Sequence, residues 1–302
     1  MNRVATPVFH QALSGSIQRA QAQLVTTQQE VASGKKASTY AGLGGDTVRS
    51  ISARSMLSRT EAYATVAART ATTLSLYDAN LTQAESTAST LRQDLFTALG
   101  RGNTLGLQST IESAFDAFAN TLNATEGGVP LFAGSRTSET PFKVGSLADT
   151  LSLAGNAAFA SDDGQQTARL GDGLDVRFGV GAHTIGGDAL EAFRTLAAAG
   201  PFGEMPTDAQ KAALKQAIEQ LDKGIGAIQT ANAENGRKQA HVETLANNAE
   251  ARGVILKTII SDSEDVDLAQ VAINLAQQKT ALDASYSVFA KLSGLSLVNF
   301  FS

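Results

Sequence analysis

The sequence predicts a mainly α-helical protein, in which N- and C-terminal segments form a long antiparallel helical bundle or coiled coil and a small β-rich head is inserted in the middle. Two observations predict this class. Apolar residues recur at heptad spacing near both ends of the 302-residue chain, and helical periodicity fades between residues 129 and 206, where glycines cluster. Apolar residues make up 43% of the chain and charged residues 18%, which suits a chain that builds a core.

The first helix is predicted over residues 13–31. One set of mainly apolar residues recurs there, with the spacing between successive members alternating between four and three. This spacing places the set on one narrow helix face. This face consists of Leu13, Ile17, Ala20, Leu24, Thr27 and Val31. Gly34 follows at the position of a left-handed helix cap, and the glycine-rich AGLGGD at 41–46 separates this helix from the next.

The second helix is predicted from about Asp46 to Leu99 and ends at GRGN, residues 100–103. Its later half carries the same kind of seam: Leu74, Tyr77, Leu81, Ala84, Ala88, Leu91, Leu95 and Ala98. A shorter amphipathic helix follows, with Leu107, Ile111, Phe115, Phe118 and Leu122 on one side. Successive long helices are typical of a bundle.

The middle of the chain, from about Val129 to Pro206, predicts the head. Residues 167–181 read as two short strands joined by a turn at Asp172 and Gly173. The glycine-rich GVGAHTIGG at 179–187 is interpreted as a turn region. A short helix is expected from Asp188 to Ala199, closed by Gly200 and Pro201.

The C-terminal third mirrors the first. Thr207 and Gln210 form a capping box that starts a helix running to about Ile260, and Ser261 and Glu264 form a second box. A seam with Gln278 and Ser285 as its polar positions follows. Its apolar members are Leu268, Val271, Leu275, Leu282, Phe289 and Leu292, and it continues into Leu295, Leu297, Phe300 and Phe301.

These elements predict three domains. Residues 1–45 with 261–302 form a terminal coiled-coil assembly domain, 46–128 with 207–260 a helical bundle domain, and 129–206 the β-rich head. Each terminal helix has few apolar side chains to bury. The free energy of burying them only marginally offsets the conformational entropy that is lost when the backbone is ordered. We therefore expect the terminal segments to be loose in the monomer and ordered when several copies pack together.

Composition argues against several kinds of partner. The net charge is −5 without a block of like charges, so no basic surface for nucleic acid is expected. No stretch approaches the ~18 apolar residues of a membrane span. The chain has no cysteine, and its first thirty residues lack the apolar run of a Sec signal peptide. If the protein is exported, we expect an export route that does not depend on a cleaved hydrophobic signal peptide.

No motif predicts catalysis, a cofactor or a metal site. The histidines, at 10, 183 and 241, have no ligand at suitable spacing. SGKK at 33–36 lacks the flanking residues of a phosphate loop. Glu264, Asp265 and Asp267 could ligate calcium, but acidic residues are also favoured where a helix starts. Neither Ser33 nor Ser293 has an adjacent base. We therefore predict that the protein is not an enzyme.

Two phrases resemble a known family. In GVPLFAGSRTSETPF, residues 128–142, the matching positions are Gly128, Leu131, Phe132, Ala133, Gly134, Thr137, Pro141 and Phe142. In the C-terminal QQKTALDASYSVFAKLSGLSLVNFF they are Gln278, Thr280, Ala281, Leu282, Ala284, Ser285, Tyr286, Gly294, Leu295, Ser296 and Leu297, approached by EDVDLAQ at 264–270. These phrases resemble bacterial hook-filament junction proteins of the FlgL type, within the flagellin superfamily.

The resemblance implies a structural role in an extracellular flagellum. Proteins of this type form a thin zone between the first hook-associated protein and the flagellin filament, and are exported unfolded by the flagellar type III apparatus. The partners implied are further copies of the chain, the first hook-associated protein, flagellin and an export chaperone, with neither nucleic acid nor membrane.

The terminal seams would then be the assembly interface. Its predicted members are Leu13, Ile17, Leu24, Val31, Leu268, Val271, Leu275, Leu282, Phe289, Leu292, Leu295, Leu297, Phe300 and Phe301. Flagellin, the bulk filament subunit, is the alternative within the same architecture. A soluble helical enzyme or a coiled-coil adaptor is the alternative from another class, and it would be favoured by a monomer that melts cooperatively with both termini included.

Overall fold

The computed structural model describes the backbone of residues 5–153 and 155–301 and the side chains of residues 11–153 and 155–291. Contacts divide the chain into two compact units. The terminal unit comprises residues 1–59 with 252–302, and the central unit comprises residues 60–251. Two long helices, α2 (Thr47–Arg101) and α5 (Asp208–Glu264), contribute to both units.

The predicted fold class is confirmed, because long helices dominate and only a small β region lies in the middle of the chain. The other helices are α1 (Ala5–Ser33), α3 (Leu107–Leu122), α4 (Ala182–Ala199) and α6 (Leu268–Phe301). Short 3-10 turns occupy Tyr40–Asp46, Leu131–Ala133, Ala148–Leu151 and Gly155–Ala158.

The β region consists of two antiparallel hairpins in the central unit. Strand β1 (Thr125–Glu126) pairs with β2 (Val129–Pro130). Strand β3 (Gln166–Gly171) pairs with β4 (Leu174–Phe178) around Asp172 and Gly173, as the Asp-Gly turn predicted. Val176 and Phe178 are buried on one face of this second hairpin.

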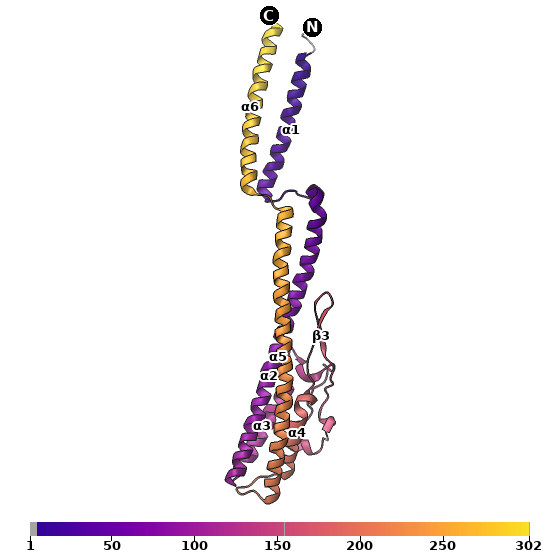
Figure 1. Cartoon of the computed structure of the whole chain (residues 1–302), viewed down its shortest axis with the longest axis vertical. Coiled ribbons are helices and arrows are strands. Elements are labelled where there is room, and N and C mark those ends of the chain that lie inside the picture. The colour runs from indigo at the N-terminus through magenta and orange to yellow at the C-terminus, as the bar shows by residue number, and fades with distance from the viewer. Residues whose placement is uncertain (1–4, 154, 302) are drawn as a thin grey trace. The chain divides into compact units, whose positions relative to one another are not determined.

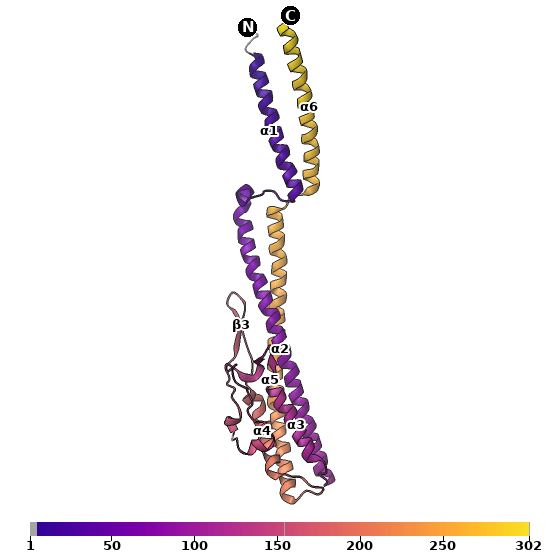
Figure 2. The same cartoon turned by 180° about the vertical axis from the view of Figure 1, so that it is seen from behind.

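In the terminal unit, α1 and α6 lie side by side (Figures 1 and 2). Helix α1 ends where predicted, because Gly34 adopts φ 67° and its amide donates to the Glu30 carbonyl at 2.8 Å. The first turns of α2 and the last turns of α5 share a second small core, in which Ala53 contacts Leu256 and Ile260.

In the central unit, α3 and α4 lie against α2 and α5 (Figure 1). Every residue of the predicted α2 seam from Leu74 to Ala98 is buried, as is the predicted face of α3. Aromatic rings fill the centre: Phe115 and Phe193 meet edge to face, with centroids 5.3 Å apart. The carbonyl of Leu74 accepts from the amides of Asn235 and Gln239, both at 2.9 Å, which joins α2 to α5.

The GVPLFAGSRTSETPF phrase supplies core and turn positions of the central unit. Leu131, Phe132 and Phe142 are buried, and the Tyr77 hydroxyl donates to the Leu131 carbonyl. Gly134 has φ 68°, and a Cβ there would lie 2.2 Å from the carbonyl oxygen of Asp162. Only glycine therefore fits this turn.

The turn region predicted at residues 179–187 is wrong in part, because α4 already begins at Ala182. The glycines of this stretch do not break the helix. A Cβ on Gly186 would come within 2.9 Å of Leu122 and 3.2 Å of Phe159, so the absence of a side chain lets α4 approach α3 closely. Ala182, Ile185 and Ala189 bury the same face of α4.

The capping box predicted at Ser261 and Glu264 is also wrong. Helix α5 continues to Glu264, and the break lies at Asp265–Asp267. Asp267 caps α6, because its Oδ1 accepts from the backbone amides of Ala269 at 2.9 Å and Gln270 at 3.2 Å. The capping box at Thr207 and Gln210 is confirmed by reciprocal bonds of 3.0 and 3.2 Å.

We predict that Gly134→Ala destabilises the central unit by about 3 kcal/mol, because the new methyl group adds a clash with Asp162 to the strain of a positive φ. Gly128→Ala is the matched control. Its φ is 87°, but nothing lies within 4 Å of the new Cβ, so about 1 kcal/mol is expected. Urea unfolding measures both, and equal losses would contradict the role assigned to the close approach.

Candidate functional site

Two short segments meet where α1 and α5 end. The amide of Lys36 donates to the Glu264 carbonyl at 2.7 Å, and the amide of Val266 donates to the Gly34 carbonyl at 3.0 Å. Lys35 and Asp265 thereby form an isolated antiparallel bridge. We call residues 34–36 and 262–267, together with Ser50 and Arg54 of α2, the joint.

The Glu264 carboxylate is the centre of the joint, with only 8% of its side chain exposed. Arg54 makes a bidentate interaction with it: Nε donates to Oε1 at 2.6 Å and Nη2 donates to Oε2 at 2.5 Å. The Ser50 hydroxyl donates to Oε1 at 2.6 Å, and Lys35 Nζ lies 3.4 Å from Oε2. One carboxylate thus joins α2, α5 and the end of α1 through charge-assisted hydrogen bonds.

These donors lower the pKa of Glu264 to about 2, with the hydrogen bonds from Arg54 and Ser50 as the largest causes. Beside it, Asp265 Oδ1 pairs with Lys35 Nζ at 2.5 Å and Oδ2 accepts from the Ser261 hydroxyl at 2.7 Å. This pairing lowers the pKa of Asp265 and raises that of Lys35. Lys36 Nζ donates to the Asp262 carbonyl.

Among the residues predicted for the assembly interface whose side chains are described, most lie on the inner faces of α1 and α6. Ile17, Val271 and Leu282 are buried, and Leu13, Leu24, Leu275 and Phe289 are half-buried. Val31 and Leu268 are instead exposed. The side chains of Leu292, Leu295, Leu297, Phe300 and Phe301 lie outside the described residues, although the α6 backbone continues to Phe301.

The outer surfaces of the same two helices are poor in charge. Helix α1 has two charged residues in 29, Arg19 and Glu30, and α6 has three in 34. Large apolar side chains are exposed on them, and more are exposed on the α2 and α5 portions of the terminal unit. These are Val25, Val31, Val48, Ile51, Val254, Ile255, Leu268, Ile273, Tyr286 and Val288. We call this set the exposed apolar set.

A polar position within the helix pair is incompletely satisfied. Gln278 Oε1 is buried without a hydrogen-bond donor among the described residues. Gln278 also lines a shallow surface hollow of about 310 Å³, together with Ala22, Gln23, Thr26 and Thr27 of α1. A buried carbonyl oxygen without a donor is costly, so this position favours a further donor.

Two of the groups considered above for metal binding make packing or hydrogen-bond contacts within the described part of the chain. Both oxygens of Glu264, weighed as a calcium ligand, accept hydrogen bonds from donor side chains. His183 packs edge to face on Phe159 at 5.3 Å, and His241 is exposed. Among the residues that the structure describes, no group of three His, Cys, Asp or Glu could hold a metal ion. No described helix is long and apolar enough to cross a membrane.

Sequence reasoning missed Ser50 and Arg54. They lie one helical turn apart on α2, more than 200 positions from Glu264, and nothing in their local pattern signals a shared partner. The one hint in the local pattern is a glutamate that directly follows Ser263, four residues after the apolar pair Ile259–Ile260, and such a pattern also predicts a helix cap.

Comparisons with known proteins agree with this architecture. The family described as bacterial flagellin C-terminal helical region matches residues 218–301. The chain is 26% identical over 218 residues to flagellar hook-associated protein 3 of Escherichia coli (strain K12). That match covers 63% of this chain and 64% of the relative, so the chain spans less than two thirds of the relative's length.

Solved structures share the fold. A flagellar hook-associated protein from Vibrio parahaemolyticus gives a TM-score of 0.61 at 16% identity, covering 72% of this chain and 97% of that one. Xanthomonas campestris FlgL gives 0.55 at 14% identity over 68% and 99%. Bacillus cereus FlgL gives 0.52 at 15% identity over 65% and 98%. The chain is therefore similar in sequence and in fold to structural proteins of the flagellum.

We predict that the Glu264 carboxylate stabilises the terminal unit at neutral pH. Because its folded pKa is about 2, below the ordinary 4.5, this contribution is present above pH 4.5 and is lost as the pH falls toward 2. Glu264→Gln should lower the free energy of unfolding by about 2 kcal/mol at pH 7, since two partners lose charge-assisted bonds.

Urea unfolding of the wild type and Glu264→Gln between pH 7 and pH 2 measures this contribution. The two curves should converge near pH 2. Glu250→Gln, an exposed position on the same helix, should follow the wild type throughout. A constant difference across the pH range would contradict the assignment.

Proposed function

We propose that this chain is a structural subunit of the bacterial flagellum that forms the junction between the hook-associated zone and the flagellin filament. It assembles with further copies through α1 and α6. Its axial neighbours are the first hook-associated protein on one side and flagellin on the other. Export by the flagellar type III apparatus, with a chaperone bound beforehand, belongs to the same proposal.

The observation that carries the proposal is the surface of the helix pair. A helix that carries large apolar side chains on its outer face as well as its inner face is normally buried in its working state. The exposed apolar set leaves large side chains such as Ile273 and Val288 about half exposed. Burial of each against a neighbouring copy contributes roughly 1 kcal/mol, so the six members of the set on α1 and α6 together favour association.

Two further observations support self-assembly. Gln278, whose buried side-chain oxygen has no donor among the described residues, lines a surface hollow of the helix pair that a neighbouring copy would fill. The Glu264 carboxylate joins the start of α2, the end of α5 and the segment after α1, so the helix pair presents its surface on a fixed base. Preorganised surfaces lose less entropy on association than flexible ones.

The junction role is favoured over the bulk filament by the resemblance of FAGSRTSETPF and of the SGLSL ending to hook-filament junction proteins, and by similarity to flagellar hook-associated protein 3. Flagellin is the second candidate, because the match at residues 218–301 is to the flagellin C-terminal helical region. The two roles differ in where the subunit lies along the flagellum.

Immunogold electron microscopy of isolated flagella, with antibody against residues 130–206, tests the proposal. A single labelled band where hook meets filament is the expected result. Label along the whole filament would instead assign the chain as flagellin. Flagella without label would overturn a flagellar role.

We predict that Ile273→Asp blocks assembly without unfolding the monomer. Ile273 is 53% exposed on α6, so an aspartate is tolerated in the free chain but would be a buried, unpaired charge in the assembly. The labelled band should disappear, while the far-UV circular dichroism melt stays within a few degrees of the wild type.

Leu151→Asp is the matched control, since Leu151 is also 53% exposed but lies in the central unit. It should leave the band unchanged. A normal labelled band with Ile273→Asp would show that this face of α6 is not part of the assembly interface.

A further inference from the structure

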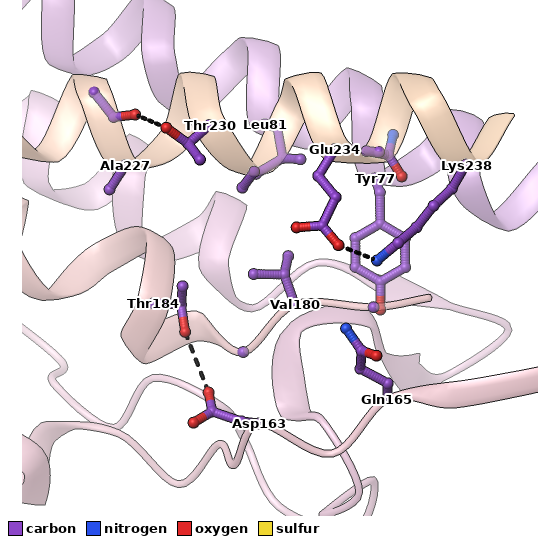
Figure 3. Close-up of a pocket in the computed structure, with 15 residues that line it drawn as sticks. Tyr77, Leu81, Asp163, Gln165, Val180, Thr184, Ala227, Thr230, Glu234 and Lys238 are labelled. Carbon is purple, nitrogen blue, oxygen red and sulfur yellow. Dashed lines mark hydrogen bonds and ion pairs between the residues drawn. The ribbon is translucent and has the colours of Figure 1, made fainter. Parts of the chain in front are cut away.

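A pocket of about 470 Å³ lies in the central unit, between α5 on one side and the segments around Asp163 and Val180 on the other (Figure 3). It is separate from the terminal unit and from the proposed assembly surface. We propose that this pocket binds an alkylammonium group, that is, a primary ammonium carried on a short apolar stem.

The volume and walls suit such a stem. Ligand pockets typically span roughly 300–1,000 Å³ and are lined mainly by apolar groups with a few polar ones. Here Tyr77 and Leu81 of α2, Val180, and Ala227 and Ala231 of α5 form the apolar walls. These groups offer carbon contacts and few competing hydrogen bonds.

The charged side chains at the rim of the pocket favour a positively charged ligand. Glu234 and Lys238 of α5 form an ion pair of 2.7 Å, and only 20% of the Lys238 side chain is exposed. On the opposite wall, Asp163 accepts one hydrogen bond, from the Thr184 hydroxyl at 3.2 Å, and no cation of the described residues pairs with it. The lining therefore carries one unbalanced negative charge.

An ammonium group fits this arrangement better than a carboxylate or a neutral group. It brings three donors to a site with acceptors at Asp163 and the side-chain amide of Gln165, while the aromatic ring of Tyr77 lines the same space. A carboxylate would meet Asp163 and Glu234, and its one attractive partner, Lys238, is already paired.

Saturation-transfer difference NMR on the full chain at pH 7 tests this, with three probes that share a four-carbon stem: n-butylamine, 1-butanol and butyrate. For so few atoms we expect a Kd on the order of 1–10 mM for the amine. The alcohol should bind at least about tenfold more weakly and butyrate should give no signal, and the amine signal should fall with added salt. Equal signals from the three probes, or none from the amine, would overturn the proposal.

Variants locate the binding. Gly226 lines the pocket, and nothing lies within 4 Å of a Cβ built on it, so Gly226→Leu introduces a bulky side chain at the pocket wall without a clash at its first carbon, and it improves helix propensity. It should abolish the amine signal. Gly236→Leu is the control, because Gly236 is an equally open position on α5 outside the pocket.

Charge is tested separately. Asp163→Asn keeps a hydrogen-bond acceptor for Thr184 and should weaken amine binding at least about tenfold. Asp175→Asn, on the exposed part of β4, should leave it unchanged. An amine signal that survives both Gly226→Leu and Asp163→Asn would show that binding occurs elsewhere and would overturn the assignment.

An alkylammonium group can come from a free amine or from a lysine side chain of a partner protein. Nα-acetyl-lysine-N-methylamide presents the same stem on a peptide backbone. Tighter binding of this compound than of n-butylamine would assign the site to a partner's lysine, and weaker binding would assign it to a free amine. Absence of binding by both compounds would refute the proposal.

Discussion

The organisation of the terminal unit depends on one buried carboxylate. Glu264 ends α5, and it binds Arg54 and Ser50 of α2 and Lys35 after α1. A buried charge is tolerated only when hydrogen bonds and opposite charges surround it, and here its partners are already in place. Because those partners come from two segments more than 200 residues before Glu264, the carboxylate fixes where the helices end relative to one another.

The helix pair beyond the joint has the opposite character. It is held by a narrow seam in which Ile17, Val271 and Leu282 are buried, while much of its outer surface is small or apolar. Such a surface is costly in water and favourable in an assembly, so the same residues that make the isolated unit marginal would drive association. The central unit differs, because a large aromatic and aliphatic core stabilises it without a neighbour.

In the central unit, packing explains one conspicuous group of residues and leaves another unexplained. Its GVPLFAGSRTSETPF phrase provides buried side chains and a turn that only Gly134 can occupy, which accounts for these residue types on packing grounds. The pocket beside α5 has no such structural reason for its unbalanced Asp163 or for the open space at Gly226. The packing of the fold therefore accounts for the phrase but not for the charge and open space of this pocket.

The sequence by itself determined the helical class, the seams, the Asp172–Gly173 hairpin and the end of α1 at Gly34, because periodicity and turn chemistry are local properties. Only the tertiary structure decided the rest. Glycines 186 and 187 lie within α4, since Gly186 fits against Leu122 of a distant helix, and Glu264 serves as a hub because Arg54 and Ser50 reach it across the fold. Long-range packing and charge pairing leave no mark in a local pattern, so the outward exposure of Val31 and Leu268 and the pocket at Asp163 could not be predicted from sequence alone.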